Sequence, residues 1–365
     1  MSDQVSFPQS TKENYNSEDV IDFVLSFQNM KIKRNSIRLQ GDIELLKSGN
    51  TNDIPLTADI RKDNIQYDGY CGLHGVFSNV TTSTESGVLD NMVQYGYYVK
   101  TKTMINVNKS ELGARSDYLS EGRIPSDKLT KYLLFNNPAS QNVMSFSLKP
   151  DCALNNSNMD ISYTKTGQCK ISLRVASANQ FLYGSTTGYY FRLKNLKLRY
   201  KALPDDGKDE GDLLFNVVNI VHNTISNNNA NLSSNVAGVC QSVSIVFRQQ
   251  DKSNIYASNH YELDYPNNIT DVEFSWNDEL NRYISYRLRT EQEILRNFVE
   301  SMGNPDKDMN AIRPTELNHG KNYGVGLKFG APTDLSNQKF NFNLVSDISD
   351  KPYNCFMIFR GVVKQ

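Results

Sequence analysis

The same alternating pattern occurs twice in this chain, once in each half. Residues 170–177 read KISLRVAS and residues 339–346 read KFNFNLVS, and in both an apolar residue stands at every second position after a lysine. A period of two places alternate side chains on opposite faces of a β-strand. We therefore expect half-buried strands of antiparallel sheets, and the recurrence of the pattern predicts two copies of one folding unit.

The neighbours of the two copies recur in the same order. An LK-containing strand pattern precedes each copy and an aromatic-rich one follows it, at 146–150 and 189–202 in the first half and at 325–329 and 355–359 in the second. Short β patterns also coincide by chance, so one large irregular β-protein remains the alternative. The matching order favours an internal duplication.

Local signals add detail to this plan. In residues 189–202 the alternation slips by one residue at Asn195, which predicts a β-bulge. The segment 290–305 predicts a helix, because Thr290 and Glu293 form a capping box and Gly303 supplies a stop. A weaker helical pattern covers residues 126–135.

Length and composition limit the class of protein. The 365 residues suit two domains, and 38% of them are hydrophobic, as in an ordinary folded protein. The net charge of −1 argues against direct, sequence-specific or coating contact with nucleic acid, which needs a basic surplus. No apolar run reaches the ~18 residues of a membrane-spanning helix, and the N-terminus has no apolar segment of a signal peptide. The odd set of scattered cysteines predicts buried thiols rather than disulfides: Cys71, Cys152, Cys169, Cys240 and Cys355.

Domain boundaries are predicted where the polarity and the periodicity of the sequence change. Residues 1–18 are polar and without periodicity, which predicts a flexible N-terminal arm. Residues 203–212 read LPDDGKDEGD, an acidic stretch that predicts a linker. The expected division is an arm at 1–18, a first β unit at 19–203, a linker at 204–212 and a second unit at 213–365.

A unit of about 160 residues with some eight short strands and long loops fits a β-sandwich, and among sandwiches a jelly roll. Four segments resemble the strand-and-turn sequences of one family: 21–43, 72–95, 189–205 and 323–347. The chain resembles the double jelly-roll major capsid proteins of icosahedral DNA viruses, which include tailless membrane-containing phages, adenovirus and virophages. The resemblance implies an all-β fold of two tandem eight-stranded jelly rolls with short helices in the loops.

The resemblance also implies a function and partners. Three chains would form a homotrimeric, six-lobed capsomer, and a lattice of these trimers would tile the shell of a virion assembled in the host cytoplasm or nucleus. In this family, long loops project outward from the shell as towers. Here they would lie at 100–142 and 303–322, and 223–235 would be either a third tower or a flexible surface loop. The arm 1–18 and the tail after Arg360 would reach neighbouring proteins, among them minor capsid or vertex proteins, or an underlying viral membrane.

Catalytic and metal-binding readings find little support. The histidines are not arranged as HExxH, HxH or a zinc cluster: His74, His222, His260 and His319. His260, Glu262 and Asp264 alternate, which predicts a solvated strand face more readily than a metal site. The acidic linker 205–212 lacks the terminal bidentate glutamate of a calcium loop. We therefore expect no enzyme, no cofactor, and no catalytic or metal site.

Two other functions remain open at this point. A carbohydrate-binding or glycan-processing jelly-roll protein would need exposed aromatic residues and, for hydrolysis, paired carboxylates. The one tryptophan, Trp276, is expected to point inward, so no such platform is evident. A minor vertex or spike protein is the other alternative, and copy number in purified particles would separate it from a major shell protein.

Overall fold

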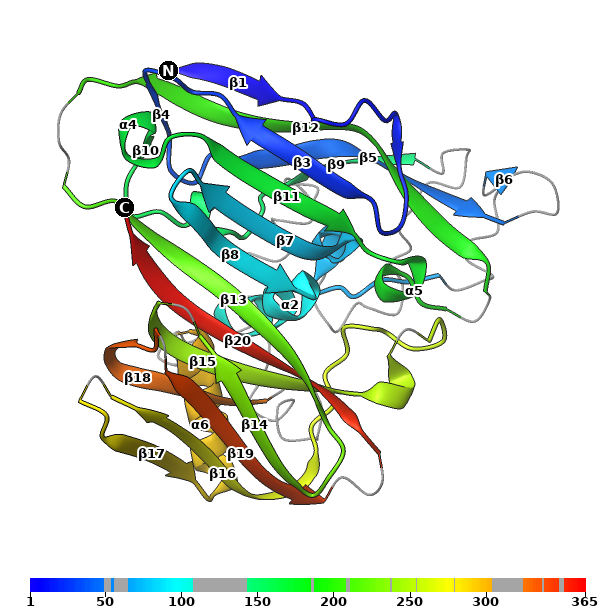
Figure 1. Cartoon of the computed structure of the whole chain (residues 1–365). Coiled ribbons are helices and arrows are strands. Elements are labelled where there is room, and N and C mark those ends of the chain that lie inside the picture. The colour runs from blue at the N-terminus through cyan, green and yellow to red at the C-terminus, as the bar shows by residue number, and fades with distance from the viewer. Residues whose placement is uncertain are drawn as a thin grey trace.

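The first sandwich of the computed structural model is built from two antiparallel sheets (Figure 1). In the outer sheet, β12 lies between β5 on one side and the N-terminal strands β1 and β2 on the other, and β5 pairs with β9. In the facing sheet the order is β3, β11, β7, β8. The strands are β1 (Ser2–Ser6), β2 (Asn14–Tyr15), β3 (Val20–Leu25), β5 (Arg38–Lys47), β7 (Phe77–Thr84), β8 (Gly87–Val93), β9 (Val143–Leu148), β11 (Cys169–Val175) and β12 (Tyr189–Pro204).

The second sandwich has the same wiring. One sheet follows the order β13, β20, β15, β18, and the other follows β14, β19, β16, β17. In chain order these are the B to I strands of a jelly roll, with B-I-D-G in one sheet and C-H-E-F in the other, as in the first sandwich. The strands are β13 (Leu214–Ile225), β14 (Asn229–Asn235), β15 (Val239–Gln249), β16 (Asn267–Asn277), β17 (Tyr283–Leu288), β18 (Val325–Asp334), β19 (Lys339–Asp347) and β20 (Tyr353–Lys364). The predicted all-β jelly-roll class is confirmed.

Short elements complete the fold. The structure describes residues 1–48, 54–55, 65–107, 143–184, 187–207, 211–236, 238–253, 255–278, 280–303, 324–336, 338–347 and 351–365. Within these ranges the remaining elements are β4 (Met30–Ile32), β6 (Ile54–Pro55), β10 (Ile161–Ser162), α2 (Tyr95–Asn106), α4 (Tyr163–Thr166), α5 (Ala178–Phe181), α6 (Glu291–Met302), η1 (Gly72–Val76), η3 (Ala153–Asn155) and η4 (Gln250–Lys252). The predicted helical segment 126–135 lies outside the described residues, as do residues 108–142 and 304–322 of the two predicted tower segments. Residues 100–106 are not part of a tower, because they form the largely buried second half of α2.

The repeated sequence pattern falls on equivalent strands. KISLRVAS lies on β11 and KFNFNLVS on β19, and each is the H strand of its sandwich. The LK patterns lie on the G strands, β9 and β18, and the aromatic-rich patterns on the I strands, β12 and β20. The duplication read from the sequence therefore has a counterpart in strand order and sheet position.

The predicted bulge and the predicted helix are both present. The register between β12 and β5 shifts between Lys194 and Lys197, and Asn195 adopts a φ of 52°. Opposite the bulge stands Gly41, where an added Cβ would lie 2.5 Å from Leu196, so only glycine fits there. Helix α6 begins after Thr290, which forms the predicted capping box with Glu293.

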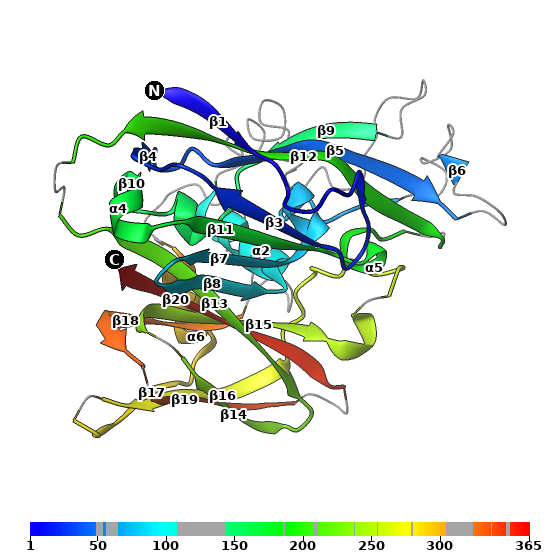
Figure 2. The same cartoon turned by 45° about the horizontal axis from the view of Figure 1, so that its top comes forward.

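A single sheet joins the two sandwiches. Strand β8, the F strand of the first, pairs in parallel with β13, the B strand of the second, at Asn91 with Asn219 and Met92 with Ile220. The C-H-E-F sheet of the first sandwich thereby continues into the B-I-D-G sheet of the second as one eight-stranded sheet (Figures 1 and 2). The two halves share backbone hydrogen bonds as well as side-chain contacts.

The N-terminal segment differs from the expected flexible arm. Residues Ser2–Ser6 pair along β12 and Asn14–Tyr15 pair with it further on, so together they form the B strand of the first sandwich. Tyr15 is buried and its hydroxyl donates to the carbonyl of Ser10. The alternation was hidden because Ser2, Gln4 and Ser6 are polar, whereas strand pairing uses the backbone. We propose that the first unit begins at Ser2 rather than at residue 19.

The Asn-rich segment 223–235 is neither a tower nor a floppy loop. Its residues complete β13 and form β14, which pairs with β19 over seven positions from Asn229 to Asn235.

The five cysteines are all buried and free, as expected. The acidic segment after β12 begins with Asp205 and Asp206, which lie 3.5 Å and 2.8 Å from the Lys31 ammonium.

Candidate functional site: the junction between the two sandwiches

The loop between β15 and β16 carries the contacts that connect the sandwiches away from the shared sheet. Residues 255–265 of this loop lie against helix α2 and the short helix η1 of the first sandwich. The loop supplies the backbone carbonyl of His260, the ring and hydroxyl of Tyr261 and the side-chain amide of Asn259 to that surface. The junction is therefore the place where the relative position of the two halves is determined.

Tyr261 is the aromatic anchor of this junction. Its ring is buried against Gly96 of α2, and a Cβ added at Gly96 would lie 2.3 Å from the ring. Its hydroxyl donates to the carbonyl of Gly75 at 3.3 Å, and its ring packs edge-on against Tyr97 at 5.3 Å between centroids. Glycine is required at position 96 because the ring occupies the space of a side chain.

Tyr97 continues the aromatic contact into the second sandwich. Its ring stacks on Phe356 of β20, with centroids 4.2 Å apart, and its hydroxyl donates to the carbonyl of His260 at 2.7 Å. Burial raises the pKa of Tyr97 far above its ordinary value, so the hydroxyl remains a donor. Helix α2 of the first sandwich thus contributes a ring and a hydrogen bond to the second.

A buried ion pair adds a polar connection. The Lys100 ammonium on α2 lies 2.7 Å from Asp68, and both side chains are buried. The same carboxylate accepts from the backbone N–H groups of Tyr70 and Cys71 and from the side-chain amide of Asn259 in the second sandwich. Because every Asp68 oxygen is hydrogen-bonded, the buried charge is compensated.

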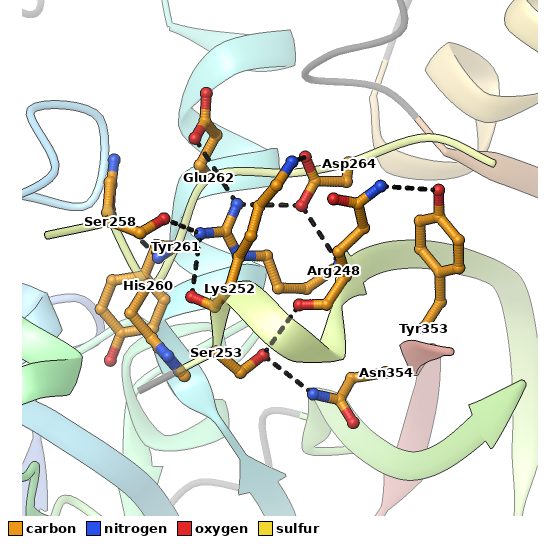
Figure 3. Close-up of polar contacts among 12 residues, drawn as sticks. Arg248, Lys252, Ser253, Ser258, His260, Tyr261, Glu262, Asp264, Tyr353 and Asn354 are labelled. Atoms are coloured by element: carbon orange, nitrogen blue, oxygen red, sulfur yellow. Dashed lines mark hydrogen bonds and ion pairs between the residues drawn. The ribbon is translucent and has the colours of Figure 1, made fainter. Parts of the chain in front are cut away.

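Arg248 is the centre of a second buried cluster (Figure 3). Its side chain is 0% exposed, at the end of β15, and its guanidinium lies 2.9 Å from Asp264 and 3.5 Å from Glu262. It also donates to the carbonyl of Lys252 and to the hydroxyl of Ser258. The guanidinium thereby ties both ends of the β15–β16 loop to the strand that precedes it.

The predicted solvated strand face at residues 260–264 is wrong. His260 and Asp264 are buried and Glu262 is partly buried, and the segment is a loop rather than a strand. Asp264 faces Arg248, whereas His260 lies near Gln94 of the first sandwich at 3.2 Å. Burial lowers the pKa of His260 to about 3, so the ring is neutral.

Arg248 was not singled out from the sequence. It follows the apolar run VSIVF, and a charged residue that ends a buried strand needs a buried counter-charge. The acidic residues of the next loop, at positions 262 and 264, are the natural partners. Their spacing alone does not reveal which of them reaches the guanidinium.

Asp90 anchors the shared sheet beneath this junction. One oxygen accepts from the Val218 backbone N–H of β13 at 2.8 Å, and the other accepts from Thr82 and from the Ala153 backbone N–H. The carboxyl is fully buried, and burial raises its pKa to about 6 despite these hydrogen bonds. Strands β7, β8 and β13 and the short helix η3 therefore meet at one carboxyl group.

We expect Asp90 to make the stability of the junction pH-dependent. The folded-state pKa lies above the ordinary value of 3.8, so the stabilisation by the protonated group is complete below pH ~4 and is lost as the pH rises through about 6. The amplitude is about 3 kcal/mol. His260 acts in the opposite sense, because its lowered pKa costs stability as the pH falls below 6.5.

A comparison with Asp90→Asn isolates this effect. The free energy of unfolding of the wild type minus that of the variant should decrease by up to about 3 kcal/mol between pH 4 and pH 7. Urea unfolding at several pH values measures it, and the His260 contribution cancels in the difference. A difference that is constant over this range would contradict the assignment.

The other sequence candidates are placed as follows. His74 bonds to the Tyr95 hydroxyl at 3.0 Å and His222 to Asn354 at 3.1 Å, while His319 lies outside the described residues. Trp276 is buried and packs edge-on against Phe329. Among the described residues there is no group of three metal-ligating side chains, and no described helix has the length and hydropathy needed to cross a membrane.

Comparison with solved structures identifies the architecture. The chain aligns over its full length with the Faustovirus major capsid protein, at a TM-score of 0.61, 9% identity and 90% coverage of that chain. It aligns equally fully with a PBCV-1 virus capsid chain (TM-score 0.58, 9% identity, 94% of that chain) and with a chain of the Sputnik virophage (0.57, 7%, 86%). The chain has the double jelly-roll fold.

Sequence comparison does not reach these structures. No protein-family model matches the chain, and no curated protein matches it in sequence. At 7–9% identity the double jelly-roll arrangement is shared through the strand order and not through particular residues. The residues of the junction therefore have to be interpreted from this chain alone.

Proposed function

We propose that this chain is a major capsid protein that assembles as a homotrimer with six jelly-roll lobes. The supporting observation is that one chain carries two identically wired sandwiches, joined by a continuous sheet. A six-lobed tile made from three chains needs two similar lobes per chain in a fixed relation. The junction formed by Tyr261, Asp68 and Asp90 supplies that fixed relation.

The proposed role requires no catalytic group. Shell building depends on buried apolar area and on complementary edges, and a closed cyclic trimer leaves its outer faces for growth of the lattice. Similarity in fold to the Faustovirus major capsid protein, to a chain of the PBCV-1 virus capsid and to a chain of the Sputnik virophage supports a place in the virion. Contacts with minor capsid or vertex proteins and with an underlying viral membrane belong to the same proposal.

The trimer is the first test of this function. The purified chain at micromolar concentration should have a mass of about 124 kDa, three times its 41.4 kDa. Light scattering measures the mass, and negative-stain images should show six lobes around one axis. A chain that remains monomeric at these concentrations would contradict the proposal, and about sixty copies per purified particle would favour a vertex protein instead.

A further inference from the structure

The internal junction joins two particular edges of the jelly rolls. The F strand of the first sandwich, β8, lies beside the B strand of the second, β13. Each sandwich has one F strand and one B strand, so one of each is not used in this junction. These are β17, the F strand of the second sandwich, and β1 with β2, which form the B strand of the first. Within the described residues, β17 pairs only with β16, and β1 and β2 pair only with β12.

The two F strands differ in burial, although they occupy the same place in their sheets. On β8, Leu89, Asp90 and Met92 are buried, because β13 and the second sandwich lie beside them. On β17 the side chains of Tyr283, Ile284 and Tyr286 are exposed, and only Leu288 is buried. The difference is what the absence of a neighbouring sandwich would produce.

Two of the exposed residues of β17 lie on the face of the sheet that is turned toward the core of the second sandwich. Ile284 pairs with Trp276 and Tyr286 pairs with Phe274, and directly paired residues point to the same side of a sheet. Trp276 and Phe274 are buried, yet Ile284 is 36% exposed and Tyr286 is 43% exposed. The apolar core face of this sheet therefore continues past the cover of its own sandwich.

The N-terminal edge shows the complementary feature. On β13 the residues Val217, Val218 and Ile220 are buried at the internal junction. At the equivalent edge of the first sandwich, Met1, Val5 and Phe7 are exposed. Of the twelve large apolar side chains exposed in the described residues, seven lie on or directly beside these two edges: Met1, Val5, Phe7, Leu280, Tyr283, Ile284 and Tyr286.

The two edges lie at opposite ends of the molecule. In both views β1 is at the top of the first sandwich and β17 is at the bottom of the second (Figures 1 and 2). One copy therefore cannot bring its own two edges together, whereas the edges of two copies can meet. Unpaired strand edges with exposed apolar residues associate readily.

We propose that β17 of one copy docks beside β1 and β2 of the next copy and repeats, between chains, the junction that β8 and β13 make within one chain. The two strands would run parallel, as β8 and β13 do. The inference rests on the proposed trimer, in which three such contacts alternate with three internal junctions and close a ring of six sandwiches. The contact is heterologous, and it is closed only by cyclic symmetry.

Charge insertion at either edge tests the contact. The variants Ile284→Arg/Tyr286→Arg and Val5→Arg/Phe7→Arg should convert the trimer to monomer at micromolar concentration, measured by light scattering. Each removes exposed apolar area and places two like charges in the contact. The matched control is Val143→Arg, an exposed apolar residue of β9, which lies at the edge of the outer sheet opposite to β1 and β2, and it should remain trimeric. Circular dichroism should give the same strand signal for all variants.

Cross-linking tests which edges meet. The native cysteines are buried, so a chain with Val5→Cys and Tyr286→Cys offers two reactive thiols. A short bis-maleimide should give covalent trimer on a denaturing gel with the double variant, and only monomer with either single variant. Covalent dimers from a single variant would mean that like edges meet, and would overturn the inference.

The outcomes separate this inference from the function on which it rests. A wild-type chain that is monomeric overturns both. A wild-type trimer that neither charge variant dissociates, and that the double cysteine variant does not cross-link, overturns the docking of β17 on β1 and β2 while the capsid function remains supported.

Discussion

Replacement of Asp264 by alanine is expected to lower the free energy of unfolding by about 3–5 kcal/mol. Arg248 is fully buried at 0% exposure, and Asp264 is its nearest counter-charge at 2.9 Å. Without that carboxylate the guanidinium keeps its charge, because arginine is not deprotonated in proteins. Glu262 remains at 3.5 Å but is partly exposed, so it compensates the charge only in part.

The surface ion pair of Arg296 with Glu300 provides the control for Asp264→Ala. This pair has a similar separation, 2.7 Å, but the arginine side chain is 77% exposed. Arg296→Ala should therefore cost only about 0.5 kcal/mol. Urea unfolding of both variants gives the comparison, and equal losses would show that the Arg248 cluster is solvated in solution.

Tyr261→Ala is the second change with a large expected effect, a loss of about 3–5 kcal/mol. The ring fills the space over Gly96 and contacts Tyr97 edge-on, so its removal leaves a cavity between the two sandwiches. Neighbouring backbone cannot collapse into that space, since α2 and the β15–β16 loop are each held by other contacts. Thermal unfolding of the variant should then show two separate transitions, one for each sandwich, because the two sandwiches no longer unfold together.

The conservative variant Tyr261→Phe separates the ring from its hydroxyl. It keeps the packing and loses only the hydrogen bond to Gly75, so we expect a loss of about 1 kcal/mol and a single transition. If phenylalanine were as damaging as alanine, the hydrogen bond rather than the filled space would maintain the junction.

Several features of the fold could be predicted because their causes are local. Alternation in residues 170–177 and 339–346 places every second side chain in a core, and it identifies the two H strands wherever they lie. The slip at Asn195 predicts the bulge, since one extra residue reverses the faces. The capping box at Thr290 and Glu293 predicts the start of α6 within one turn of chain.

The errors arose where the cause is a partner distant in sequence. Residues Ser2–Ser6 are a strand because β12 offers a free backbone edge some 190 positions later, and their polar side chains carry no sign of it. Within the segment 223–235, residues 223–225 pair with β20 and residues 229–235 pair with β19, both more than a hundred positions away. His260 and Asp264 are buried because α2 and Arg248 face them.

By itself, the sequence determined that this chain forms half-buried strands, repeats one β unit and buries its cysteines. These properties depend on the order of apolar and polar residues over a few positions. Only the tertiary structure decided which strands are neighbours and that β8 continues into β13. It also decided that, within the part of the chain that the structure describes, β1 pairs only with β12 and β17 only with β16. Backbone hydrogen bonds between strands are the same for every residue type, so the choice of neighbour depends on how the whole chain packs.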